Sequence, residues 1–277
     1  MYRHKRRETF FIFLWFFMTF LSGTEVQNES KKVPDMNFPV ITVVFDNNPC
    51  KKGLQSGWGF SCLIEGMEKR VLFDTGAEGT LLLDNMQKLG ITPGMIDVLL
   101  LSHAHSDHTG GAYRLLQKKN DTLTVYLPAS FPENFKEKTG SYGAALIEVK
   151  KPMKISDGVY STGEMGARMK EQSLILRTPK GMVILTGCAH PGIVNIVKRA
   201  KALFHEEVLL VMGGFHLHNK SSREIKRIIL DMQRLGVRYV GPCHCSGKKA
   251  RDLFEKAYGE HYIPIGVGTR IETKALQ

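Results

Sequence analysis

The sequence has no apolar run long enough for a typical membrane-spanning helix and too few cysteines for a disulfide framework. The apolar run at residues 9–21 has 13 residues, whereas a spanning helix needs roughly 20. Five cysteines are an odd number, so a complete set of disulfides is excluded, although Cys50 and Cys62 could pair across a hairpin. The sequence also lacks internal repeats and long low-complexity segments, which leaves an ordinary globular domain as the expected class.

The N-terminal segment differs in composition from the rest of the chain. Basic residues cluster at positions 3–7, the apolar run follows, and small residues occupy positions 22–24. This order is typical of a secretory signal peptide and predicts an exported protein, either secreted or periplasmic. An uncleaved membrane anchor is the alternative, because the run is rich in phenylalanine and no clean Ala-x-Ala site follows it. The expected divisions are a signal peptide at 1–24, a polar linker at 25–38 and a folded domain at 39–277.

The chain is basic both with and without its N-terminal segment. The formal net charge is +11, and residues 1–24 hold four basic residues and one acidic residue, so the remainder carries +8. A basic surface favours the approach of an anionic small-molecule substrate. The basic residues are scattered and have no interleaved aromatic residues, which argues against nucleic-acid binding. A membrane partner is expected only if the N-terminal segment stays uncleaved, and the sequence does not determine an oligomeric state.

Residues 39–277 contain short apolar strands followed by alternating strands and helices, in two successive halves. This order is typical of an α/β protein with an αββα sandwich, in which two mixed sheets pack together and helices cover both outer faces. Strands are predicted at 40–45, 60–64, 70–73, 97–101, 123–127, 145–149, 173–178, 182–185, 208–212 and 237–240. Helices are predicted at 80–89, from Gly111 to 118, and at 193–204, 221–235 and 248–258.

Four potential metal ligands fall within six residues, directly after the predicted strand 97–101. They are His103, His105, Asp107 and His108. In extended backbone, residues two apart point to the same side, so His103 and His105 can meet one ion. Imidazole and carboxylate groups suit zinc, and also iron or manganese. The segment therefore predicts a site for one or two metal ions, with Zn²⁺ as the first choice.

The segment 103–108 resembles the H-x-H-x-D-H signature of the metallo-β-lactamase superfamily. Residues 73–76, with the sequence FDTG, resemble an upstream element of the same superfamily. The order and spacing agree over residues 40–271 and imply the αββα fold. The resemblance implies that Asp74 supports the ligands from behind and that His244 is the last ligand along the chain.

Three further segments resemble one branch of that superfamily, the dihydropterin-synthase-like branch. They are residues 186–195, 213–217 and 244–247. The branch is named for a methanopterin-pathway enzyme that joins a dihydropterin diphosphate to an aminobenzene riboside phosphate. Many similar sequences are known only as metal-dependent hydrolases.

Two departures from the superfamily pattern affect the expected ligand set. No histidine lies between His108 and His190, so the usual mid-chain ligand is missing, and His190 is expected to replace it. Most members carry a bridging aspartate after a Thr-Gly pair, whereas this chain has Cys188. Cys188 is either a thiolate ligand or a small packed residue, and the second interpretation is favoured because His190 already offers a ligand from the same loop. His216 is expected to ligate metal or contact substrate, with a structural role as the alternative.

These features predict a metal-dependent hydrolase that acts on a phosphorylated or ester-like small molecule through a metal-bound hydroxide. Asp107 is expected to orient the nucleophile and accept its proton, and His216 to stabilise developing negative charge. A dihydropterin diphosphate-dependent transferase is the alternative, although the export signal argues against it because pterin diphosphates are made and used inside cells. A non-catalytic metal-binding protein is the second alternative.

Expression in a host that exports proteins should test the N-terminal prediction. We expect the mature protein to lose about 24 residues and to be found outside the cytoplasm. Intact-mass measurement of the purified protein checks the cleavage. Recovery of the full-length chain from the membrane fraction would instead support the uncleaved anchor.

Overall fold

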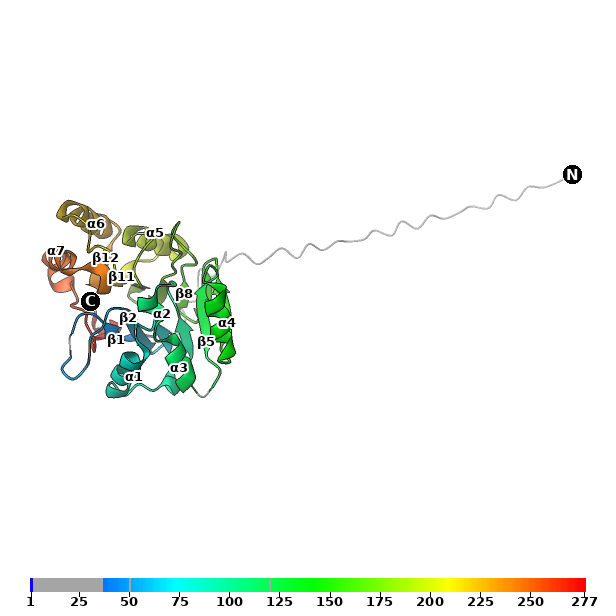
Figure 1. Ribbon diagram of the computed structural model, residues 1–277. Coiled ribbons are helices and arrows are strands. Elements are labelled where there is room, and N and C mark those ends of the chain that lie inside the picture. Colours follow the sequence, from blue (N-terminus) through cyan, green and yellow to red (C-terminus); the bar gives the residue numbers. More distant parts are fainter. Residues whose placement is uncertain (2–36, 50, 120) are drawn as a thin grey trace. The chain divides into compact units, whose positions relative to one another are not determined.

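The computed structural model describes Met1 and residues 37–49, 51–119 and 121–277 (Figure 1). The chain divides into two units, Met1–Val33 and Pro34–Gln277. The predicted signal peptide, apart from Met1, and nearly all of the predicted linker lie outside the described residues. Within the described part of the chain, no helix has the length and apolar character needed to cross a bilayer.

Two mixed β-sheets form the centre of the second unit. The first sheet has the strand order β13-β1-β2-β3-β4-β5-β6, and the second has the order β12-β11-β10-β9-β8-β7. The strands of the first sheet are β1 (Val40–Asp46), β2 (Phe60–Glu65), β3 (Val71–Phe73), β4 (Val98–Leu100), β5 (Thr124–Pro128), β6 (Ala145–Val149) and β13 (Arg270–Glu272). Those of the second are β7 (Met153–Ser156), β8 (Val159–Ser161), β9 (Leu174–Thr178), β10 (Gly181–Thr186), β11 (Val208–Gly214) and β12 (Val237–Cys243). Strands β3 to β6 and strands β10 to β12 run parallel, and the other neighbours are antiparallel.

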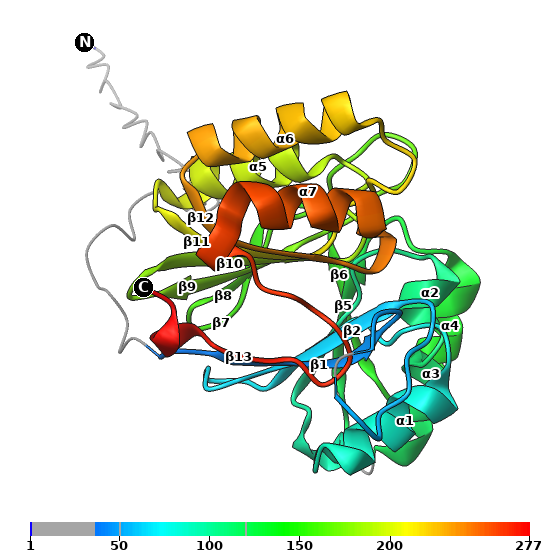
Figure 2. The ribbon, with the colours of Figure 1, turned by 90° about the vertical axis from the view of Figure 1, so that its left-hand side faces the viewer.

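Helices cover the outer faces of both sheets, as Figure 2 shows for α5, α6 and α7 on the second sheet. The α-helices are α1 (Gly79–Lys88), α2 (Ser106–Thr109), α3 (Ala112–Lys118), α4 (Glu133–Ser141), α5 (Ile193–Phe204), α6 (Ser222–Arg234) and α7 (Lys248–Tyr258). Short 3₁₀ helices are η1 (Pro93–Met95), η2 (His244–Ser246), η3 (Gly259–His261) and η4 (Thr273–Ala275). Helix α5 buries Ile193, Ile196, Val197 and Ala200, a spacing that places one apolar stripe against the sheet.

The alternation of side chains along each strand produces the four layers. In β10, Val183 and Leu185 belong to the apolar cluster between the two sheets. Met182 and Ile184 point the other way and pack in the cluster beneath the outer helices, because successive side chains of a strand face opposite sides. Side chains of strand β4 alternate in the same way in the first sheet. Val98 and Leu100 belong to the cluster between the sheets, and Leu99 packs in the cluster that includes residues of α1 and α3. The predicted αββα sandwich is confirmed.

Strands β7 and β8 and helix α4 are among the elements that were not predicted from the sequence. Strands β7 and β8 have only four and three residues, too few for a clear alternation of apolar and polar residues. Helix α4 has the sequence ENFKEKTGS, which contains a single large apolar residue and therefore no apolar stripe. The possible disulfide is also not supported, because Cys62 is a free thiol buried in β2, while Cys50 lies outside the described residues.

The ends of the parallel strands position the candidate site. Asp74 follows β3, and His103 comes after β4 in the first sheet. Cys188 comes after β10, and His244 directly follows β12 in the second sheet. Ligand sites in α/β proteins gather at the carboxyl ends of parallel strands, and here the ends from both sheets contribute.

Replacing Gly213 with alanine should separate β10 from β11. Gly213 has φ +117°, and an added Cβ would lie 2.0 Å from the carbonyl oxygen of Thr186, so we expect a loss of roughly 3 kcal/mol or more in the free energy of unfolding. Gly90→Ala is the matched control, since Gly90 has φ +75° and open space around it and should lose only about 1–2 kcal/mol. Chemical denaturation measures both variants, and equal losses would rule out the strand contact as the constraint.

Candidate metal centre

The predicted ligand segment runs from the end of β4 into α2. His103 Nε2 lies 3.1 Å from His105 Nδ1, so the two imidazoles meet on one side as the spacing predicts. Asp107 and His108 belong to α2, and an Asp107 carboxylate oxygen lies 3.7 Å from His108 Nε2. The four side chains therefore face one region from two sides.

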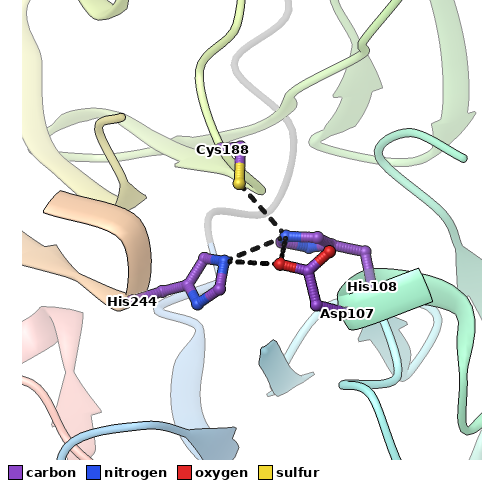
Figure 3. A group of neighbouring side chains, drawn as sticks. All are labelled: Asp107, His108, Cys188 and His244. Carbon is purple, nitrogen blue, oxygen red and sulfur yellow. Dashed lines mark hydrogen bonds and ion pairs between the residues drawn. The ribbon is translucent and has the colours of Figure 1, made fainter. Parts of the chain in front are cut away.

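The second sheet brings two further histidines to the same region. The ring of His190 lies 4.7 Å from the ring of His103 and 4.9 Å from that of His105, measured between centroids. His244 Nε2 lies 3.2 Å from His108 Nε2 and 3.2 Å from an Asp107 oxygen (Figure 3). The six predicted ligands thus form two adjacent groups, one around His103 and one around His108.

A hydrogen bond at Nδ1 fixes the orientation of four of these imidazoles. Each Nδ1 faces an oxygen acceptor, so the proton is assigned to Nδ1 and the lone pair of Nε2 points into the site. Such contacts behind a ligand set its tautomer and ring orientation. The pairs are His103 with Ser102 Oγ at 2.9 Å, His108 with Asp74 Oδ2 at 2.7 Å, His190 with Glu171 Oε2 at 2.8 Å and His244 with Asn47 Oδ1 at 2.9 Å.

Asp74 lies behind the ligands. Its side chain accepts hydrogen bonds from the backbone N–H and the hydroxyl of Ser102, both at 2.7 Å, in addition to the one from His108. Burial raises the pKa of Asp74 to about 7, against the opposing influence of His103 and Ser102. A cation bound nearby favours the ionised carboxylate, so metal binding and this hydrogen-bond network reinforce each other.

Glu171 is a functional residue that nothing in the sequence singles out. Its buried carboxylate accepts hydrogen bonds from the backbone N–H groups of Cys188, Ala189 and His190, at 2.9, 2.8 and 2.8 Å, and from the His190 ring. Burial alone would raise the pKa of Glu171, but the hydrogen bonds from His190 and the influence of His103 outweigh it and lower the pKa. Glu171 stands before β9 with no spacing relation to the ligands, so only the fold brings it here.

Asp46 and Asn47 hold His244 in a similar way. Asp46 accepts a hydrogen bond from the backbone N–H of His244 at 3.1 Å, and Asn47 donates to the His244 carbonyl oxygen at 3.2 Å. Both residues lie at the end of β1 and were also missed in the sequence. Their contacts fix the backbone and the ring of His244 together.

The arrangement of donor atoms fits a metal ion. Around His108, two imidazole nitrogens and a carboxylate oxygen face one another, and a cation between them would be attracted by all three donor atoms. Burial lowers the pKa values of His103 and His108 to about 3, so these two imidazoles are neutral at neutral pH. Burial also acts to lower the pKa of His244, but its hydrogen bond with Asp107 outweighs burial and raises that pKa. Ligands about 2.0–2.3 Å from a tetrahedral zinc ion lie about 3.3–3.6 Å from one another, close to the distances found here.

His216 lies beside the first group. Its ring is 4.7 Å from that of His190, and the residue is exposed. A hydrogen bond with Cys245 raises the pKa of His216, although burial acts in the opposite direction. The position suits a group that contacts a bound molecule from the solvent side of the ligands.

The fold and the donor set define a class of protein. The family model of the metallo-β-lactamase superfamily matches residues 59–244, and the chain belongs to that superfamily. It is an enzyme of the metallo-β-lactamase fold. Among its relatives, it is 28% identical over 284 residues to the 7,8-dihydropterin-6-methyl-4-(β-D-ribofuranosyl)-aminobenzene-5′-phosphate synthase of Methanocaldococcus jannaschii, covering 85% of this chain and 97% of that protein.

Solved structures agree on the fold. A crystal structure described as a metal-dependent hydrolase of the β-lactamase superfamily superposes with a TM-score of 0.71 and 30% identity, covering 84% of this chain and 98% of the other. The metallo-β-lactamase fold protein YhfI from Bacillus subtilis gives a TM-score of 0.63 at 16% identity, covering 84% of this chain and 99% of the other. The second likeness shows the fold alone.

Replacing Glu171 with glutamine should weaken metal binding. The NH₂ group of the glutamine would face the backbone N–H groups or the His190 Nδ1–H, which are themselves donors. The hydrogen bonds that hold the loop and the imidazole would therefore be lost. We expect a drop of about 10–100-fold in zinc affinity, measured by competition with a chelating dye. Glu206→Gln is the control, because that carboxylate pairs with Arg177. Equal affinities for both variants would show that Glu171 does not position His190.

Proposed function

We propose that the chain is a metal-dependent hydrolase that acts on a phosphorylated or ester-like small molecule, with one or two Zn²⁺ ions as its metal. The observation that carries this proposal is the pair of adjacent donor groups with lone pairs directed inward. In the proposed assignment, His103, His105 and His190 hold one ion. Asp107, His108 and His244 hold the other.

When bound, two such ions would lower the pKa of water and polarise the bond to be cleaved, and so would supply a hydroxide nucleophile at neutral pH. Burial would raise the pKa of Asp107, but its hydrogen bond with His244 outweighs that influence and lowers the pKa. Asp107 is therefore ionised and can accept a hydrogen bond that orients the nucleophile, and we propose that the proton of the nucleophile passes to it. His216 can donate a hydrogen bond to the oxygen on which negative charge develops.

The relatives and the charge of the chain support this choice. The structure with 30% identity is described as a metal-dependent hydrolase. Residues 25–277 carry a formal charge of +8, which attracts anionic substrates. Export from the cytoplasm, proposed from the N-terminal sequence, would place the enzyme where such compounds can be taken from the surroundings.

A transferase acting on a dihydropterin diphosphate is the second candidate. The similarity to the M. jannaschii synthase extends over 97% of that protein. In addition, Trp58 is 56% exposed, and its ring lies 5.0 Å from the ring of His244. An exposed aromatic face beside the donor groups can stack on a planar ring such as a pterin.

Replacing His103 or His105 with alanine should lower metal content and activity together. Each imidazole is expected to bond to the metal directly, so we expect turnover to fall by at least about 100-fold, beyond the effect of a residue behind the ligands. Metal content is measured by elemental analysis of the purified variants. His261→Ala is the control, since His261 lies in η3, outside the cluster. Full metal content with unchanged turnover in both variants would contradict the assignment.

A panel of substrates separates the two candidate functions. Zinc-loaded protein is assayed on phosphodiesters, phosphomonoesters, lactones and β-lactams, and in parallel on a dihydropterin diphosphate with an aminobenzene acceptor. Turnover of an ester class supports the hydrolase. Turnover only in the joining reaction would replace it with the transferase.

A further inference from the structure

Cys188 is shared by all the candidate donor groups among the described residues. One group combines it with Asp107, His108 and His244, another with His103 and His190, and a third with His216 and Cys245. Within each group, the donor atoms lie within 4.8 Å of one another. The sulfur therefore lies where the two proposed ion sites adjoin.

Among these donor atoms, His108 Nε2 is in direct contact with the Cys188 sulfur. Cys188 Sγ lies 3.2 Å from His108 Nε2 (Figure 3). The Nδ1 of this imidazole is bonded to Asp74, so the atom that faces the sulfur carries a lone pair. A sulfur and a nitrogen that share a tetrahedral zinc ion lie roughly 3.5 Å apart, which is close to this distance.

The surroundings of Cys188 differ from those of the buried cysteines in the core. Cys62 and Cys243 belong to the apolar cluster between the sheets. Cys188 is 3% exposed, but it is not a member of the apolar clusters of the described residues, and its sulfur contacts imidazole instead. This placement argues against a residue that serves only to fill space.

The backbone of the loop holds Cys188 at this position. Its N–H donates to Glu171 at 2.9 Å. The preceding residue, Gly187, packs so tightly that an added Cβ would lie 2.1 Å from Ser102 Oγ and 2.9 Å from Asp74 Oδ2. The loop is thus pressed against the residues behind the ligands, and the next side chain points between the two groups.

We propose that the Cys188 sulfur bridges the two metal ions, because it lies between the two donor groups and contacts His108; this inference rests on the proposed two-metal function. On binding, the Sγ–H proton is released to solvent and the sulfur bonds to both ions. A thiolate prefers softer metals, so the site favours zinc over magnesium or manganese. A thiolate at this position would therefore select the metal.

Cobalt substitution tests the bridge without depending on activity. Metal-free protein is titrated with Co²⁺, and the thiolate-to-cobalt charge-transfer band in the near ultraviolet is followed. We expect the band to grow through both equivalents, because both ions would contact the sulfur, and to be lost in Cys188→Ser. Cys62→Ala and Cys245→Ser are the matched cysteine controls and should retain it.

Stoichiometry gives an independent readout. Cys188→Ser should lose about one ion per chain, whereas Cys188→Asp should hold both ions without the band, which also shows that the altered loop folds. A band that survives in Cys188→Ser, or that is lost in Cys245→Ser instead, would overturn the proposal. A band that stops growing after one equivalent would also overturn it, because the sulfur would then contact a single ion. The ester panel is run on the same zinc-loaded preparations, so a bridged site without hydrolysis would reject the hydrolase and leave the bridge in place.

Discussion

The arrangement of the site depends on hydrogen bonds made behind the imidazoles. Where an oxygen accepts a hydrogen bond from Nδ1, the imidazole ring has a fixed orientation. The Nε2 atoms of these rings then all face the candidate metal site. Two of the acceptors, Asp74 and Glu171, are buried carboxylates, which are costly to bury without partners. Both satisfy that requirement with backbone N–H groups as well as imidazoles. The loops after β4 and β10 are therefore shaped by the same bonds that orient the ligands.

The fold could be predicted from local patterns, and the candidate ligands from local patterns together with the resemblance to the superfamily. Apolar alternation and helical spacing locate most elements, and the histidine spacing at 103–105 follows from extended backbone. The six predicted ligands are brought together by the structure. The end of β12 was predicted too early, at Val240, because glycine and proline, here Gly241 and Pro242, commonly follow the end of a strand. In the structure the strand continues to Cys243. An added Cβ at Gly241 would lie 2.8 Å from Ile265, so the glycine allows Ile265 to pack closely against the strand.

Apart from Asp74, which the resemblance to the superfamily indicated, the residues behind the candidate ligands could not be predicted, because their partners are distant in the chain. Asn47 and His244 are 197 positions apart, and Glu171 acts on a loop that begins after β10. No local spacing links such residues, and an acidic or amide side chain before or after a strand has many ordinary roles. The place of Cys188 between two groups is likewise a property of the tertiary structure, although the sequence does mark the position as unusual.

The origin of the ligands in both sheets has a mechanical consequence. His103 and His105 are carried by the first sheet, whereas His190 and His244 are carried by the second, so a metal ion at this edge would fasten one sheet to the other. The free energy of metal binding then adds to the cohesion of the sandwich. The two sheets could then not separate at this edge without release of the ions. In the metal-free protein, the contact between the sheets would be least stable at the edge where catalysis is proposed to occur.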